Sequence, residues 1–282
     1  MKIILFSGPY GNLTSLYTGI LAAHPQVAGL NHGRWEVPEG CSFFLHREAK
    51  DIERSLQQFI KNVLLKKEEW TNHALENGNL ESMSHVSRYQ TENPLAVFWK
   101  ESGFLTTHLR FQDNAELILS NNENVYLFRP VRNPIDCIVT NTENYHYKLY
   151  DDPARGGFIK DRWESFLPES SQFIDASIFE TGFSNFLAQW WVEDFMWHVK
   201  LKRKFPKQVI IHTAGSEFTD VLNQIGIEYT EEWGSAANKC ASDVLEKTVH
   251  PAVATDLKRH LRILLAAQFF PEARSITEEF LR

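Results

Sequence analysis

The chain has 282 residues, of which 43% are hydrophobic, and its formal net charge is −7 at pH 7. This length and apolar content suffice to bury a large core, and we expect a single domain spanning residues 1–282. The acidic balance argues against a nucleic-acid partner, because a phosphate backbone requires a basic protein face.

The three cysteines are widely spaced and form no CxxC or Cys/His pattern. This usage favours buried thiols over a disulfide framework or a zinc site, and no carboxylate/histidine cluster predicts any other metal. The apolar run at residues 3–6 is too short for a signal peptide or a membrane span. We therefore expect a cytoplasmic protein with no membrane partner.

Strands and helices alternate along the chain. Short apolar runs predict strands at residues 3–6, 27–30, 95–99, 125–128 and 209–212. Helical spacing predicts helices at residues 14–23, 52–70, 106–119, 134–149, 183–204, 218–225 and 252–270, and residues 151–173 read as a surface loop. The alternation predicts an α/β fold, a three-layer doubly wound parallel sheet whose ligand lies beyond the carboxyl ends of the strands.

The first candidate site is the glycine-containing loop between the first strand and the first helix, at residues 7–16. Amides at a helix N-terminus attract anions, so a phosphate group fits here. Thr14 or Ser15 could cap the helix. The loop lacks the lysine and the spacing of a Walker A motif, so an ordinary strand-to-helix turn stays an alternative.

The second candidate site follows the strand at residues 125–128. The strand delivers Arg132 to its end, Pro134 suits a first helical turn, and Thr140 lies two turns further on. A guanidinium and a hydroxyl could therefore meet on one phosphate. The alternative is that Arg132 pairs with a surface carboxylate and Thr140 fills a helix face.

The run from Arg132 through Asn133 and Pro134 to Thr140 resembles the 3′-phosphate-binding motif of sulfotransferases that use 3′-phosphoadenosine 5′-phosphosulfate. Weaker similarity extends along most of the chain. The resemblance implies a P-loop sulfotransferase-like fold, no metal, and transfer of a sulfonate group to a hydroxyl of a small-molecule or glycan acceptor. It implies these donor-binding residues: Tyr10, Gly11, Asn12, Leu13, Thr14, Ser15, Arg132 and Thr140.

The first loop departs from the family pattern, which places a cation and a glycine where this chain has Gly11, Asn12 and Leu13. Lys100, or Arg34, could supply the missing charge. The resemblance places a general base after the second strand, where His32 and Glu36 occur. A histidine accepts a proton near neutral pH at its ordinary pKa, so His32 is preferred to Glu36.

Three functions stay open at this point. The first is an active sulfotransferase, the second a non-catalytic protein that binds the nucleotide product, and the third a P-loop kinase. A kinase would carry a Walker lysine and an acidic residue for magnesium, and neither is found at the expected places. The kinase is therefore the weakest of the three.

Overall fold

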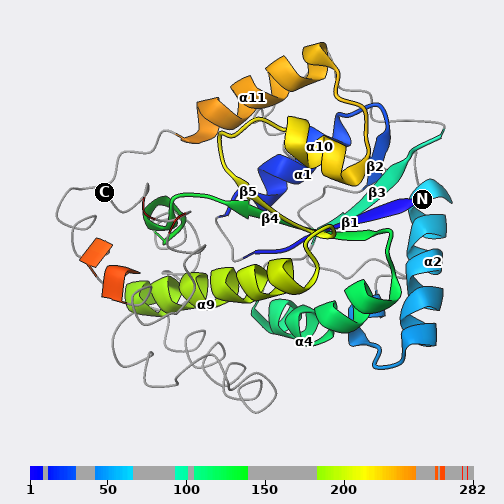
Figure 1. Cartoon of the computed structure of the whole chain (residues 1–282), viewed down its shortest axis with the longest axis horizontal. Coiled ribbons are helices and arrows are strands. Elements are labelled where there is room, and N and C mark those ends of the chain that lie inside the picture. Colours follow the sequence, from blue (N-terminus) through cyan, green and yellow to red (C-terminus); the bar gives the residue numbers. More distant parts are fainter. Residues whose placement is uncertain are drawn as a thin grey trace, which may run out of the picture.

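The structure, a computed structural model, describes residues 1–8, 12–29, 42–65, 93–100, 105–138 and 183–245, with isolated positions between 258 and 278. Within these ranges the chain forms a parallel sheet with helices on both faces (Figure 1). The predicted α/β fold with a doubly wound parallel sheet is confirmed. A single domain spanning residues 1–282 stays a prediction.

The sheet has five parallel strands in the order β2-β3-β1-β4-β5. Their bounds are β1 Lys2–Phe6, β2 Val27–Gly29, β3 Ala96–Lys100, β4 Val125–Val131 and β5 Val209–Thr213. Nearly every residue of β1, β3 and β4 is buried, as expected for strands that helices cover on both faces.

Helices cover both faces of the sheet (Figure 1). One face holds α1 Thr14–Ala22, α10 Thr219–Ile225 and α11 Glu231–Leu245. The other face holds the 3₁₀ turn η1 Ser42–Leu45 and the helices α2 Ala49–Leu65, α4 Leu105–Asn121 and α9 Phe183–Lys204. Each face therefore has its own hydrophobic core, separated by the sheet.

The chain connections diverge at the carboxyl end of the central strand, β1. The chain leaves β1 through α1 on one face, whereas it leaves β3 through α4 on the opposite face. After β4, the next helix bounded in the structure, α9, also covers that opposite face. Ligands of such sheets bind beyond the carboxyl ends of the strands where the connections diverge. This point lies at the ends of β1, β3 and β4.

Strand β4 is longer than the sequence predicts. The apolar run predicts an end at Phe128, but β4 continues through Arg129 and Pro130 to Val131. Phe128 accepts a hydrogen bond from Ser7 on the β1 side, and Val131 accepts one from Ala214 on the β5 side. By alternation, the missing N–H of Pro130 faces the β1 side, where β1 has already ended. The proline therefore costs no ladder bond, and Arg132 follows directly on the strand end.

Helix α11 was not predicted. Gly234 lies inside it, and glycine lowers helix propensity by about 1 kcal/mol. A side chain at this position would overlap the ring of Tyr229, so tertiary packing requires the glycine. Trp233 is buried in the core and its indole N–H donates to the Ile20 carbonyl at 3.2 Å, which joins α11 to α1.

The other predicted elements agree with the structure where it describes them. The helix predicted at residues 183–204 has the observed bounds, and Trp191 and Phe195 stack in the core as expected for packing residues. Cys137 and Cys240 are buried thiols, and neither is in a disulfide bond. Residues 134–138 form the start of the helix predicted after Arg132, and residues 258–259 and 261–263 are helical within the predicted 252–270. The predicted loop at 151–173 lies outside the described residues.

His212 on β5 is buried among three aromatic rings, those of Tyr17, Phe128 and Phe218. Burial lowers the pKa of His212 from 6.5 to about 4. The unfolded chain therefore binds a proton at this side chain before the folded chain does. Stability from His212 is complete above pH 6.5 and is lost as the pH falls toward 4.

We predict that His212→Phe reduces the pH dependence of unfolding. Between pH 7 and pH 4 the wild-type free energy of unfolding should fall by up to about 3 kcal/mol more than that of the variant. Urea unfolding at several pH values measures both curves, and the other histidines cancel because both proteins contain them. Parallel curves for the two proteins would contradict a neutral buried His212.

Candidate functional site

The candidate site lies at the carboxyl ends of β1, β3 and β4. Of the residues that the sequence singled out, the structure describes Lys100, Asn12, Leu13, Thr14, Ser15 and Arg132. Tyr10, Gly11, His32, Glu36 and Thr140 lie outside the described residues, as does Arg34. The meeting of Arg132 with Thr140 therefore stays a prediction.

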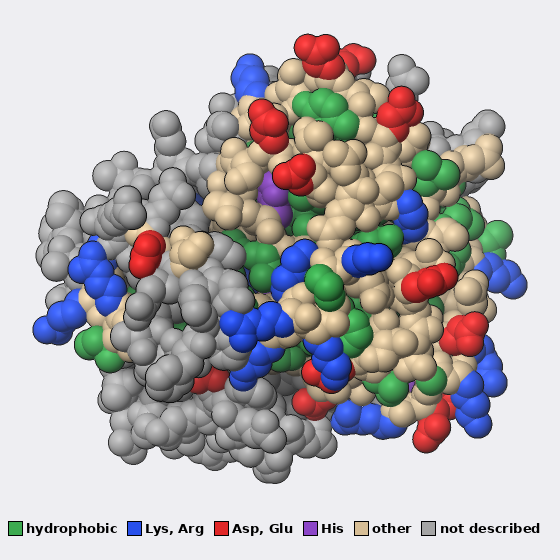
Figure 2. Space-filling model, in the orientation of Figure 1, with side chains coloured by type: hydrophobic (Ala, Val, Ile, Leu, Met, Phe, Trp, Pro, Cys, Tyr) green, Lys and Arg blue, Asp and Glu red, His purple; other side chains and the backbone are tan. Residues whose placement is uncertain are grey.

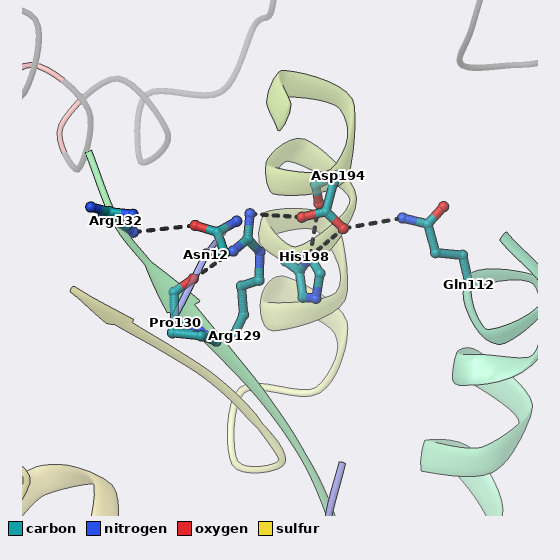
Figure 3. A network of polar contacts seen from close by, with 7 residues as sticks. All are labelled: Asn12, Gln112, Arg129, Pro130, Arg132, Asp194 and His198. Carbon is teal, nitrogen blue, oxygen red and sulfur yellow. Dashed lines mark hydrogen bonds and ion pairs between the residues drawn. The ribbon is translucent and has the colours of Figure 1, made fainter. Parts of the chain in front are cut away.

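Asn12 joins the two predicted phosphate-binding segments. Its side-chain Oδ1 accepts a hydrogen bond from the backbone N–H of Arg132 at 3.4 Å, although 120 positions separate the two residues (Figure 3). Asn12 is fully buried and Arg132 is 1% exposed. This hydrogen bond joins the loop after β1 to the residue that follows β4. That the two segments bind one ligand stays a prediction.

The N-terminus of α1 differs from the prediction. The N-cap position falls at Leu13, ahead of the predicted Thr14 or Ser15, and Leu13 makes no side-chain hydrogen bond to the helix. Leu13 adopts the left-handed conformation, with φ 61° and ψ 17°. A leucine in this region is strained by about 1 kcal/mol or more. No side chain of the N-cap residue therefore competes with an external anion for the first amides of α1.

Two buried polar atoms at the same edge make no hydrogen bond to any described residue. They are the Ser7 hydroxyl, directly after β1, and the Nδ2 amide of Asn12. A buried polar group without a hydrogen bond costs about 1 to 3 kcal/mol. Such a cost is offset when a ligand supplies the partner, so these atoms fit an anionic group with acceptor oxygens.

Lys100 is the last residue of β3 and lies opposite Phe6 in the sheet register. It is half-buried, at the same edge as Ser7 and Asn12. The position is compatible with the predicted supply of positive charge.

A buried ion pair beneath the loop was not predicted. The Arg129 Nη2 lies 2.7 Å from the Asp194 Oδ2, and both side chains are fully buried. Figure 3 shows Arg129 reaching from β4 to α9, while Arg132 lies on the other side of Asn12. The signal in the sequence was an arginine at the end of an apolar strand and an aspartate within the most aromatic helix.

His198 on α9 also contacts Asp194. Its Nδ1 lies 2.8 Å from the backbone carbonyl of Asp194 and 3.4 Å from the Asp194 Oδ1. A carbonyl oxygen only accepts hydrogen bonds, so Nδ1 carries the proton and the neutral ring has a bare Nε2. Burial lowers the pKa of His198, which keeps the ring neutral at physiological pH. Gln112 on α4 donates to the Asp194 Oδ1 at 3.4 Å, so α4 also joins the network.

Cys137 lies in the first helical turn after Arg132. Burial raises the pKa of its thiol to about 12, although the Arg129 and Arg132 guanidinium groups oppose the shift. The thiol is therefore protonated at neutral pH, and nothing points to a nucleophilic role.

Within the described ranges no group of three His, Cys, Asp or Glu side chains could hold a metal ion. No described helix combines the length and the apolar character needed to cross a membrane.

We predict that Asp194→Asn destabilises the fold by about 3 to 5 kcal/mol, because it leaves the Arg129 guanidinium buried without its counter-charge. Glu116→Gln is the matched control. It makes the same chemical change in an ion pair with Lys204 whose side chains are 55% exposed, and should cost less than about 1 kcal/mol. Urea unfolding measures both, and equal losses would contradict the special role of the buried pair.

We also predict that Leu13→Gly is more stable than Leu13→Ala by about 1 kcal/mol. Both variants remove the same packing against the core, but only glycine adopts φ 61° without strain. Helix propensity alone gives the opposite order. Chemical denaturation of the two variants decides the sign, and a more stable alanine variant would show that the left-handed conformation of residue 13 is wrong.

No family model matches the chain, and no curated protein matches it. A solved structure with some similarity is the sulfotransferase domain from the Synechococcus PCC 7002 olefin synthase. The two are 13% identical, with a TM-score of 0.41, over 100% of this chain and 94% of that one.

Proposed function

We propose that the chain is a sulfotransferase that binds 3′-phosphoadenosine 5′-phosphosulfate and transfers its sulfonate group to a hydroxyl of an acceptor. The observation that carries the proposal is the contact between Asn12 and the backbone of Arg132. It joins the loop before α1 to the arginine motif after β4. These two segments are the ones that, in the resemblance found in the sequence, hold the two ends of this donor.

The chemistry of the edge fits an anion with two phosphate-type groups. The N-terminus of α1, the Ser7 hydroxyl and the Asn12 Nδ2 offer hydrogen-bond donors on the β1 side. The Arg132 guanidinium offers a planar fork of donors on the β4 side. In the proposed complex, residues 11–15 hold the 5′-phosphosulfate, and Arg132 with Thr140 holds the 3′-phosphate.

The donor supplies an activated sulfonate group, whose sulfur bonds to the acceptor oxygen as the bond to the 5′-phosphate breaks. The chain would orient the donor, stabilise charge on the departing phosphate, and accept the proton of the acceptor hydroxyl. Lys100, at the end of β3, would stabilise the charge. His32, or Glu36 in second place, would take the proton; neither role requires a metal.

The acceptor is a small molecule or a glycan with a free hydroxyl. This proposal follows from the reaction class alone. Its chemical type is decided by segments around residues 36–50, 71–92 and 150–175, most of which lie outside the described residues.

A non-catalytic protein that binds the product nucleotide is the second candidate. The observation that favours it is the composition of the first loop, since residues 7–15 contain no lysine or arginine. Such a loop binds a phosphate through amides and hydroxyls, but stabilises less of the charge that develops during transfer.

We predict that the wild-type chain binds adenosine 3′,5′-bisphosphate with micromolar or tighter affinity. Arg132→Ala should weaken this binding by about 2 to 5 kcal/mol, at least about 30-fold, because a buried charge-assisted contact is lost. Isothermal titration calorimetry measures both affinities. Arg54→Ala is the control, since Arg54 lies exposed on α2 and pairs only weakly with Asp51.

Two outcomes count against the proposal. Binding of ATP with no binding of adenosine 3′,5′-bisphosphate would favour the kinase alternative. Tight binding of the bisphosphate without sulfonate transfer to any of a panel of phenol, sugar and alkyl hydroxyl acceptors would favour the non-catalytic alternative.

A further inference from the structure

The proposed function assigns no role to the buried network of Arg129, Asp194 and His198. All three side chains are fully shielded from solvent. Removing two charges from water costs several kcal/mol for each ion, and apolar side chains of similar size are often as stable or more stable. The network is therefore better explained by what it positions than by the stability it adds.

Arg129 lies directly against the loop that follows β1. Its guanidinium covers Gly8: a β-carbon added at Gly8 would lie 2.9 Å from Nη1 and 3.3 Å from Cζ. Gly8 has φ 153°, a conformation that side chains rarely adopt, so glycine is required there on two grounds. The Gly8 backbone thus lies on the flat face of the guanidinium.

Two polar contacts hold the guanidinium in place. Its Nη1 donates to the carbonyl of Pro130 at 2.5 Å, and its Nη2 lies 2.7 Å from the Asp194 carboxylate. Asp194 is in turn held by His198 and by Gln112 (Figure 3). The side chain of Arg129 therefore has little freedom to follow a movement of the loop.

Charge alone does not explain this arrangement. A carboxylate 2.7 Å from the guanidinium offsets part of its field at the loop, since the two opposite charges act together as a dipole. The shape and the fixed position of Arg129 are what the contact with Gly8 adds to this charge.

We propose that Arg129 is a positioning residue, which fixes the loop after β1 in its anion-binding form through Gly8, while Asp194 and His198 hold the guanidinium. The inference rests on the proposed function, because it assigns Arg129 to the segment that holds the 5′-phosphate. Arg132, only three residues further along the chain, belongs to the segment for the 3′-phosphate. The two arginines then have separate effects on the two ends of one ligand.

The test uses adenosine 5′-phosphate and adenosine 3′-phosphate as separate probes, titrated by calorimetry into the full chain. Arg129→Lys keeps the charge but loses the flat face, and Gly8→Ala keeps the arginine but adds a clashing β-carbon. Each should weaken binding of the 5′-phosphate by about tenfold or more, as small displacements of binding groups do. Each should leave binding of the 3′-phosphate within about twofold of wild type.

Arg132→Ala is the matched arginine control and should show the opposite selectivity. Near-UV circular dichroism and thermal unfolding check that each variant is folded. Should the Arg129 variant fail to fold, Gly8→Ala still tests the same contact, because it keeps both residues of the ion pair.

The outcomes separate the inference from the function on which it rests. If the wild type binds both probes and the Gly8 and Arg129 variants bind both equally well, or lose both equally, the positioning role is wrong and the proposed function stands. If the wild type binds neither these probes nor adenosine 3′,5′-bisphosphate, the proposed function is wrong and this inference falls with it.

Discussion

A buried ion pair between Arg129 and Asp194 lies beneath the candidate site. It crosses from the central sheet to α9 at the level where β1 ends. Each side chain neutralises the charge of the other in an environment without water. If one of them moved away, the other would be a buried charge without a counter-charge. The pair therefore fixes the distance between β4 and α9, and Gly8 lies against the side chain that is fixed.

The sheet topology explains why this pair lies next to the site and not elsewhere in the core. The connection from β1 leaves on one face of the sheet and the connection from β3 on the other, so the two diverge beyond the carboxyl ends of these strands. Polar side chains lie at these strand ends, whereas both faces of the sheet are covered by apolar cores. Asn12 then links the two chain segments across the edge.

Several features at these strand ends lower the stability of the fold, and a turn with a purely structural role would not need them. Leu13 is strained, α1 has no side-chain cap, and the Ser7 hydroxyl and Asn12 amide make no hydrogen bond to a described residue. Each costs about 1 to 3 kcal/mol of stability. Strain and unsatisfied donors concentrated at one end of a parallel sheet are typical of a ligand site. On the molecular surface, Figure 2 shows acidic side chains mainly at the top of the view, around α11, and a group of basic side chains in its middle.

Periodicity in the sequence was sufficient for the fold class, because a parallel sheet covered on both faces requires continuous apolar runs, and its helices require one apolar stripe. It also located Arg132 at a strand end, since Pro134 marks the start of the next helix. Helix α11 escaped prediction because Gly234 weakens its local signal, and only the packing of Tyr229 explains that glycine.

Only the tertiary structure shows the contacts between segments that are distant in the sequence. Arg129 and Asp194 are 65 positions apart in the sequence, and no local pattern states that a strand arginine and a helix aspartate will meet. The link from Asn12 to Arg132 and the left-handed Leu13 are likewise set by how α1 and β4 come together. Local propensity determines which segments become strands and helices, but burial and hydrogen bonding across the assembled sheet determine which polar groups face one another.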